Sequence, residues 1–349
     1  MGKKKLNFLM NNFTYTAWED GLGELWETFL PLLIMMVGLP GSGKTTFAKS
    51  IPKHFCNSYG IKESEFVILS SDDIRDEMFG CYRKEDNAKV FDELNKRTIK
   101  YLLEKKHVIY DATNLSRKKR INFWNEINNK LKNINIKIAK CVVFMATPYE
   151  TCLKRNANRK NKVPVEDINR MYKNIDVPDF YENQSVHYYI NYESVEMKPI
   201  FSLFTMNSDF MNFKQHNPHH SLTLGEHCMK CGDLLKEADY VLREAAYLHD
   251  IGKVFTKTFR DSKNNVTDVA HYYGHERVSA YESLFYEVVG KDDLDISDYI
   301  YVIKIRAFLI NFHMRLYFMD KSKMIEKYKL ENLPVRQLEA LHKADIDAH

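Results

Sequence analysis

Residues 32–46, LLIMMVGLPGSGKTT, contain the strongest structural signal in the chain. The first six residues, Leu32–Val37, are all apolar, as expected of a buried β-strand. They lead directly into the pattern G-x-x-x-x-G-K-[ST], in which the turn between a strand and a helix holds phosphate groups. The residues expected to form this phosphate loop are Gly38, Gly41, Ser42, Gly43, Lys44, Thr45 and Thr46.

The phosphate loop predicts that the chain binds a nucleoside triphosphate. Its glycines let backbone N–H groups turn towards phosphate oxygens, and the start of the next helix adds a partial positive charge. We expect Lys44 to reach the β- and γ-phosphates and the Thr45 hydroxyl to hold Mg²⁺. The pattern leaves kinase, ATPase and GTPase open. Because the chain has no N-K-x-D guanine-specificity motif, ATP is favoured.

The length of 349 residues predicts two domains, at roughly 150 residues per domain. Short apolar runs alternate with helical patterns up to about residue 195, which predicts an α/β domain with a parallel sheet between helices. After about residue 205 no strand pattern persists, so we expect an all-helical second domain. The expected strands are Leu32–Val37, Phe66–Ser70, His107–Tyr110, Lys137–Phe144 and His187–Ile190.

These patterns divide the chain into four segments. An aromatic-rich leader of unknown role covers residues 1–31, and the α/β domain covers 32–197. A linker, 198–207, precedes the helical domain at 208–349.

Composition is that of an ordinary globular protein. With 44% hydrophobic and 28% charged residues, a disordered, collagenous or coiled-coil chain is excluded. The net charge of +4 permits a nucleic-acid partner without arguing for one. The six cysteines form no disulfide framework, and no apolar run reaches the ~20 residues of a membrane span. We therefore expect a cytoplasmic protein without a membrane partner and leave a homo-oligomer open.

Charged and polar residues follow the second and third expected strands. Asp72 and Arg75 stand three residues apart at the start of a helix. Phosphoryl transfer to a hydroxyl needs a base and a cation, which these two residues could supply. Asp111, with Asn114 close behind it, could orient the acceptor or the metal shell. Helix capping is the simpler alternative for both aspartates.

Two arginines after the fourth expected strand suggest a lid. Arg155 and Arg159 are four residues apart and so share one helix face. Two guanidinium groups on one face suit a lid that closes on a transferring phosphate, like an arginine finger supplied in cis. A solvated basic helix is the alternative.

These motifs together resemble the phage-type polynucleotide 5′-hydroxyl kinase domain. The likeness covers about residues 34–180 and includes the segment Arg170-Met-Tyr-Lys173. It implies that Asp72 is the general base and that Arg75 contacts the acceptor end. Arg155 and Arg159 would then be lid residues, with Arg159 closer to the transferred phosphate.

The second half of the chain is rich in potential metal ligands. Ten of the 13 histidines fall after residue 200. His249-Asp250 is the strongest local signal, at the end of an expected helix, while His227 lies one helix earlier and Asp345 on the last helix. Divalent metals bind imidazole and carboxylate groups brought together from several helices. For each histidine alone, a satisfied or exposed side chain is the simpler alternative.

This set of four residues resembles the HD-superfamily metal phosphohydrolases over about residues 208–349. In that family the four residues hold one metal, whose bound water or hydroxide attacks phosphorus. His275 and His313 fit the version with a second metal. We therefore expect one or two divalent transition metals or Mg²⁺ there. His219 and His220 could bind substrate phosphate or cap a helix.

The two resemblances together imply a bifunctional enzyme, similar to HD–polynucleotide kinase enzymes, that heals RNA or DNA ends. It would phosphorylate a 5′-hydroxyl and remove a 3′-phosphate or 2′,3′-cyclic phosphate. A separate ligase would seal the ends, because the chain has no Lys-x-Asp-Gly motif. Two alternatives stay open: a small-molecule or nucleoside kinase fused to a nucleotide phosphohydrolase, and an ATP-gated nucleic-acid-binding switch.

Overall fold

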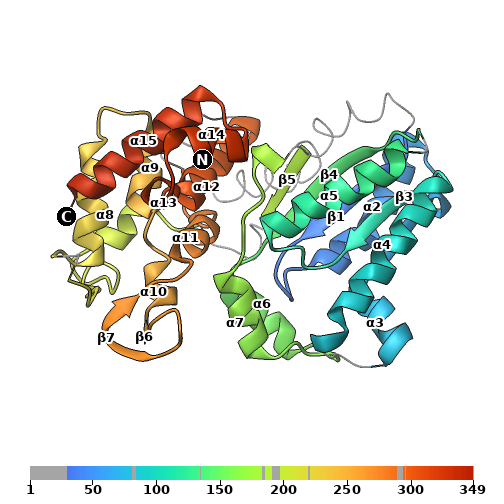
Figure 1. Ribbon diagram of the computed structural model, residues 1–349, viewed down its shortest axis with the longest axis horizontal. Coiled ribbons are helices and arrows are strands. Elements are labelled where there is room, and N and C mark those ends of the chain that lie inside the picture. The colour runs from blue at the N-terminus through green and yellow to red at the C-terminus, as the bar shows by residue number, and fades with distance from the viewer. Residues whose placement is uncertain are drawn as a thin grey trace. The chain divides into compact units, whose positions relative to one another are not determined.

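The computed structural model of the chain contains two compact units, which we call the sheet unit and the helical unit (Figure 1). The described part of the sheet unit lies within residues 30–168 and 182–190, and that of the helical unit within 169–181 and 197–348. The expected leader lies almost wholly outside the described residues. The structure describes residues 30–80, 84–133, 135–182, 185–190, 197–218, 221–288, 294 and 296–348.

A five-stranded parallel sheet forms the centre of the sheet unit, in the order β2-β3-β1-β4-β5. The apolar side chains of the central strand β1 are buried on both of its faces. The expected parallel α/β fold is therefore confirmed, and a strand lies at each predicted apolar run. The strands are β1 (Leu32–Val37), β2 (Phe66–Ser70), β3 (His107–Asp111), β4 (Ala139–Ala146) and β5 (Ser185–Ile190).

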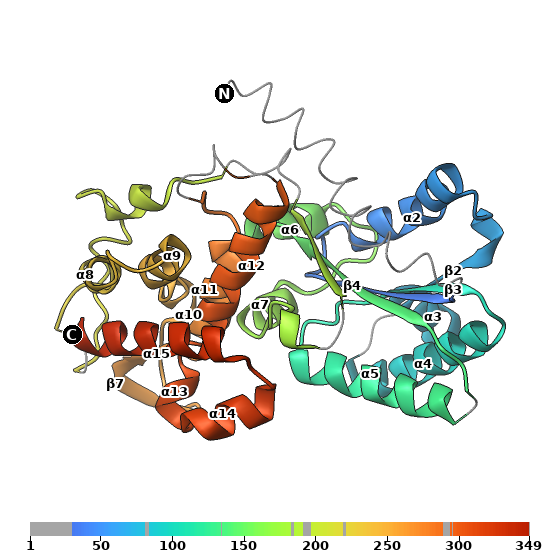
Figure 2. The ribbon, with the colours of Figure 1, turned by 90° about the horizontal axis from the view of Figure 1, so that it is seen from above.

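Helices cover both faces of this sheet. In Figure 2, which shows the sheet from its edge, α2 lies on one face and α4 and α5 on the other. Ile34 and Met36 of β1 pack in one apolar cluster with Phe55 of α2. The helices and short 3-10 turns of this part are α2 (Lys44–Tyr59), η1 (Glu63–Glu65), α3 (Ser71–Phe79), η2 (Lys84–Asp86), α4 (Asn87–Leu103), α5 (Arg117–Lys132), α6 (Tyr149–Ala157), α7 (Val165–Lys173) and η3 (Phe180–Glu182).

The helical unit confirms the expected helical second half. Among the described residues, no helix is both long and apolar enough to cross a membrane. Its elements are η5 (Ile200–Phe204), α8 (Leu224–Leu234), α9 (Tyr240–Leu248), α10 (Lys253–Thr256), α11 (His275–Ser283), α12 (Ile296–Phe312), α13 (Arg315–Phe318), α14 (Lys321–Tyr328) and α15 (Asn332–Asp347).

The expectation that no strand follows residue 205 is wrong at one place. An antiparallel hairpin joins β6 (Thr258–Arg260) to β7 (Val266–His271). Its turn is held by Asp261, whose carboxylate accepts hydrogen bonds from the backbone N–H groups of Lys263 and Asn265. β6 is only three residues long, too short to give a periodic pattern.

Residues 169–181 belong to the helical unit, although they precede β5 in the chain. The Tyr172 hydroxyl donates to Glu282 Oε1 at 2.6 Å, and Arg277 Nε lies 3.2 Å from Asp176 Oδ1. Both contacts join this segment to α11. The kinase resemblance extends to about residue 180. Its last residues therefore pack against α11, the helix that begins at His275.

Candidate functional site

The phosphate loop turns tightly between β1 and α2. Gly41 has a φ of 84°, and a Cβ added there would collide with the carbonyl oxygen of Cys152 in α6. Gly43 has a φ of 96°, and a Cβ there would lie 3.8 Å from the Arg155 guanidinium. Glycine is therefore required at Gly41 by both backbone conformation and space. The short distance between Gly43 and the Arg155 guanidinium shows that Arg155, a residue of the expected lid, lies beside the loop.

Lys44 folds over the loop and is only 8% exposed. Its ammonium donates to the Leu39 carbonyl oxygen at 2.8 Å and lies 3.5 Å from Ser42 Oγ. Burial lowers the pKa of Lys44, whereas the nearby carboxylates of Asp111 and Asp72 oppose this shift. The loop thus holds a cation where the phosphates of a nucleotide are expected.

Thr45 and Asp111 form a pair of oxygen atoms at the edge of the sheet. The Thr45 hydroxyl donates to Asp111 Oδ2 at 2.6 Å, and Asp111 is buried. Burial raises the pKa of Asp111, while Lys44 and the Thr45 hydrogen bond act in the opposite direction. A hydroxyl and a carboxylate next to a phosphate loop are ligands that suit Mg²⁺. Of the two roles that the sequence left open for Asp111, this geometry favours the metal shell.

Asp72 lies between two arginines. Arg75 Nη1 is 3.0 Å from its Oδ1, and Arg159 Nη2 is 3.3 Å from its Oδ2. The Asp72 side chain is 60% exposed, so an acceptor from solvent can reach it. Ser70 fills the capping role, because its hydroxyl accepts from the backbone N–H groups of Asp72 and Asp73. The Asp72 carboxylate is thereby left out of helix capping.

The segment after β3 is fixed by a buried ion pair that the sequence did not reveal. Arg120 contacts Glu182 through Nε at 2.7 Å and Nη2 at 2.5 Å, with both side chains fully buried. Its Nη1 donates to the Asn114 carbonyl oxygen at 2.9 Å. The Asn114 side-chain amide donates to the Met36 carbonyl oxygen at 2.8 Å. The structure therefore places the Asn114 amide nitrogen against the backbone of β1.

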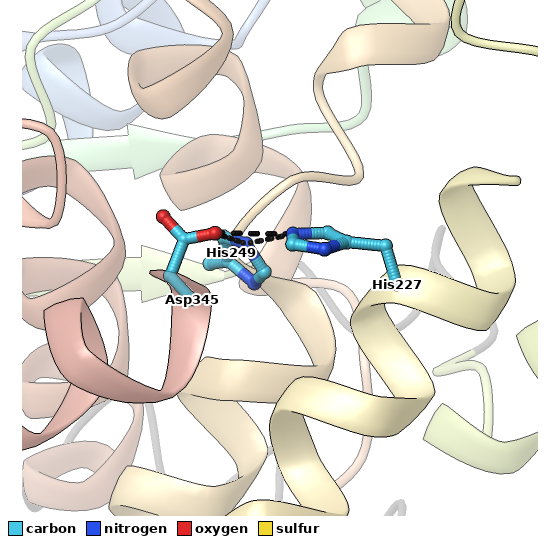
Figure 3. A group of neighbouring side chains, drawn as sticks. All are labelled: His227, His249 and Asp345. Carbon is cyan, nitrogen blue, oxygen red and sulfur yellow. Dashed lines mark hydrogen bonds and ion pairs between the residues drawn. The ribbon is translucent and has the colours of Figure 1, made fainter. Parts of the chain in front are cut away.

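Three helices bring the first group of potential metal ligands together, as Figure 3 shows. His227 comes from α8, His249 follows α9, and Asp345 comes from α15. His227 Nε2 lies 3.2 Å from His249 Nε2 and 3.1 Å from Asp345 Oδ1, and His249 Nε2 lies 3.4 Å from the same oxygen. All three side chains are buried. These nitrogen and oxygen atoms are close enough to bind one ion.

A second group shares Asp250. His275 Nε2 lies 3.0 Å from Asp250 Oδ1, and His313 Nε2 lies 3.8 Å from the same oxygen. His249, Asp250 and His313 also offer ligand atoms close enough for one ion. The structure therefore brings all six expected ligands of the helical domain into one buried cluster. His219 and His220 lie outside the described residues, and Thr223 caps α8.

The backbone fixes the orientation of three of these histidines. Nδ1 of His249, His275 and His313 each lies between 2.6 and 2.8 Å from the carbonyl oxygen three residues earlier. A carbonyl can only accept, so each Nδ1 carries a proton and donates it. In the neutral ring, Nε2 then presents its lone pair to the cluster, as a metal ligand must.

The cluster fits a divalent cation. His313 Nε2 is buried without a hydrogen-bond partner. Burial and the neighbouring His249 and His275 lower the pKa of His313 to about 3, which keeps the ring neutral. Burial alone would raise the pKa of Asp250, but Lys253 Nζ at 2.6 Å and the histidines hold it well below its usual value. The neutral His313 imidazole and the ionised Asp250 carboxylate are side chains of the kind that transition metals bind.

Sequence reasoning missed three residues that support this cluster. Lys253 contacts Asp250 and donates to Gln215 Oε1 at 3.0 Å. The Tyr317 hydroxyl donates to Asp345 Oδ2 at 2.9 Å. Lys253 could have been found, because it stands three residues after Asp250. Gln215 and Tyr317 lie in a loop and a four-residue helix, where no pattern marks them.

Both parts of the chain match known families. Residues 33–178 match the family model of the AAA domain. Residues 219–332 match that of the HD domain. The chain joins an AAA domain to an HD domain. This confirms the sequence identification of a phosphate-loop domain followed by an HD domain. The first match includes the phosphate loop and strands β2 to β4, and the second includes every residue of the metal-ligand cluster except Asp345.

Individual relatives cover only part of the chain. It is 34% identical over 148 residues to an L-seryl-tRNA(Sec) kinase of Methanococcus maripaludis, which covers 42% of this chain and 53% of the relative. The chain thus spans about half the length of that curated relative. A chain of the Pnkp1/Rnl/Hen1 RNA repair complex is 24% identical with a TM-score of 0.31, covering 41% of this chain and 43% of that chain. A sugar kinase of Janibacter sp. HTCC2649 is 16% identical with a TM-score of 0.32, covering 46% of this chain and 85% of that chain.

Proposed function

We propose that the chain is a bifunctional enzyme that heals nucleic-acid ends. The AAA domain transfers phosphate from ATP to a 5′-hydroxyl, and the HD domain hydrolyses a 3′-phosphate or a 2′,3′-cyclic phosphate. The observation that carries the proposal is that the structure brings together two groups of side chains whose chemistry suits phosphate transfer and phosphate hydrolysis. One is Asp72 between Arg75 and Arg159 in the AAA domain, and the other is the six-residue His/Asp cluster of the HD domain.

In the kinase reaction, Asp72 accepts the proton of the acceptor hydroxyl as its oxygen attacks the γ-phosphorus and ADP leaves. Arg75, buried and hydrogen-bonded to Asn87, holds the carboxylate in place. Arg159 contacts Asp72 and can exchange this contact for the transferring phosphoryl group. Mg²⁺ on the Thr45–Asp111 pair would neutralise charge on the β- and γ-phosphates.

In the hydrolase reaction, the four histidines and two aspartates of the cluster would hold one or two divalent cations. Such a cation supplies Lewis acidity towards a phosphoryl oxygen and activates a water molecule for attack. Lys253 keeps Asp250 ionised, and Tyr317 orients Asp345. The carbonyl contacts of Nδ1 hold three imidazoles with Nε2 facing inward.

The proposed acceptor is supported in two ways. The AAA domain resembles polynucleotide 5′-hydroxyl kinases, and the proposed kinase and hydrolase activities would act on matching ends. A 5′-hydroxyl and a 3′- or cyclic phosphate are the two ends left by one kind of RNA cleavage, and curing both prepares them for a separate ligase. The curated relative, named as a kinase of seryl-tRNA, favours a second candidate, in which the acceptor hydroxyl is carried on a tRNA. Both candidates share a hydroxyl borne by a nucleic acid.

One experiment tests both activities. An RNA with a 5′-hydroxyl and a 3′-phosphate is incubated with γ-labelled ATP and divalent metal, and each end is followed separately. We expect Asp72→Asn to abolish only the 5′ change, and the double variant His249→Ala/Asp250→Ala to abolish only the 3′ change. Asp73→Asn is the matched control, because Asp73 is the exposed neighbour of Asp72 and should keep both activities.

Four outcomes would contradict the proposal. Loss of both activities in either variant would exclude separate sites. Phosphorylation of free nucleosides in preference to the RNA would favour a small-molecule kinase, and preference for seryl-tRNA would favour the second candidate. ATP-dependent RNA binding with no change at either end would favour the non-catalytic switch.

A further inference from the structure

A group of rings around one lysine lies beside the hairpin of the HD domain, and the proposed hydrolysis does not use it. We call it the ring cluster: Phe213, His216, Lys257 and Phe259. The Phe259 side chain is 42% exposed and His216 is exposed. The His216 and Phe259 ring centroids are 5.9 Å apart. Large exposed rings gathered in one place on a surface mark a binding site more often than isolated ones do.

The ammonium of Lys257 is held among these rings. It lies 4.5 Å from the Phe213 ring centroid and 5.8 Å from that of Phe259. It donates to the Lys214 carbonyl oxygen at 2.6 Å and lies 2.7 Å from His216 Nδ1. The cluster therefore offers a fixed positive charge next to a flat apolar surface. Proteins bind single-stranded nucleic acids through this combination, because backbone phosphates pair with cationic side chains and bases stack on aromatic rings.

The ring cluster adjoins the candidate metal site. The backbone N–H of Lys257 donates to the Lys253 carbonyl oxygen at 3.1 Å, and the Lys253 side chain contacts Asp250. Gln215, which precedes His216, accepts a hydrogen bond from the same Lys253 ammonium. Figure 1 shows the hairpin next to α10, the helix on which Lys253 lies. Lys257 therefore lies one helical turn after a lysine that contacts a candidate metal ligand.

We infer that the ring cluster binds the nucleotides next to the terminal phosphate of a single-stranded nucleic acid. A base stacks on Phe259, and a backbone phosphate pairs with Lys257. The exposed Lys214 and Arg260, neighbours of the cluster in sequence, add positive charge. This inference rests on the proposed hydrolase function and narrows its substrate to single strands longer than one nucleotide.

The test compares 3′-phosphorylated oligonucleotides of one to eight nucleotides as substrates of the full-length, metal-loaded enzyme. The readout is the ratio of kcat/KM for the eight-nucleotide substrate to that for the mononucleotide, because a misfolded variant loses both alike. We expect Phe259→Ala to lower this ratio about tenfold or more, and Phe259→Tyr to restore it. Val266→Ala is the control, since this side chain of the same hairpin is 74% exposed but has no ring.

A second measurement follows binding of an unphosphorylated oligonucleotide by fluorescence anisotropy at several salt concentrations. Lys257→Ala should weaken binding and lower the slope of log K against log salt by about 0.7 for a single strand. An unchanged ratio and unchanged binding in Phe259→Ala would overturn the inference. Binding that depends on Phe259, in a chain that hydrolyses no 3′-phosphate, would instead refute the proposed hydrolase activity and leave the binding surface supported.

Discussion

Tyr317 lies outside the metal-ligand cluster but orients one of its ligands, Asp345. Its hydroxyl binds Asp345 Oδ2, which leaves Oδ1 directed at His227 and His249. We expect Tyr317→Phe to lower metal affinity about tenfold or more, because partners that orient a ligand typically contribute this much. Competition with a chelating dye measures it without any enzyme assay. Tyr301→Phe, at an exposed position of α12, should leave the affinity unchanged.

The Arg120–Glu182 pair should matter for stability far more than any exposed ion pair of the same domain, the sheet unit. Glu182→Gln leaves a fully buried guanidinium without its counter-charge, and we expect a loss of about 3–5 kcal/mol in the free energy of unfolding of that domain. Glu126→Gln, which removes the exposed pair with Lys130, should cost less than about 1 kcal/mol. Urea titration compares the two variants, and equal losses would contradict the prediction.

His107 should make the stability of the AAA domain depend on pH. Its Nδ1 accepts a hydrogen bond from the Leu32 backbone N–H, and burial lowers its pKa. Below about pH 6.5 the unfolded chain therefore binds a proton that the folded chain does not, so stability falls as the pH decreases from 7 to 5. His107→Gln should reduce this slope in urea titrations at several pH values. An equal slope in the variant would exclude His107 as the cause.

At the scale of elements, the phosphate loop depends on glycine at its point of contact with α6. We expect Gly41→Ala to abolish ATP binding, because it combines a φ of 84° with a collision at the Cys152 carbonyl oxygen. Gly60→Ala is the matched control: Gly60 has a φ of 70° but meets nothing within 4 Å. It should bind ATP normally, as measured by calorimetry. Normal binding by Gly41→Ala would show that the loop tolerates a shift of α6.

Elements that form a local pattern were predictable from the sequence. The run Leu32–Val37 is apolar throughout because β1 is buried on both faces, and it gave the strand bounds directly. The phosphate loop was found because its function restricts several neighbouring residues at once. The hairpin was missed because β6 spans three residues, and its pairing depends on the turn at Asp261.

Partners distant in sequence were not predictable. Arg120 and Glu182 are 62 residues apart, and Lys253 and Gln215 are 38 apart. Nothing in the composition of either segment marks its partner, because the contact arises only when the fold brings them together. The six residues of the metal-ligand cluster were an exception, because the resemblance to the HD-superfamily phosphohydrolases grouped them before the structure was known.

At the scale of the whole molecule, we expect each domain to respond to its own ligand. In calorimetry, ATP should raise the unfolding temperature of the AAA domain, and a chelator should lower that of the HD domain. A ligand at 100 times its dissociation constant stabilises the folded state by about 2.7 kcal/mol, enough to shift a transition measurably. A single transition that responds equally to ATP and to the chelator would contradict this expectation.

The hydroxyl of Ser70 has a consequence for turnover. Since it alone supplies the side-chain cap of α3, the helix end makes no demand on the carboxylate of Asp72. In the proposed kinase reaction, that carboxylate would take up and release a proton in each cycle while the first turn of α3 keeps its hydrogen bonds to Ser70. Because Ser70 caps the helix, the charge of the neighbouring Asp72 side chain can change without loss of a hydrogen bond at the start of α3.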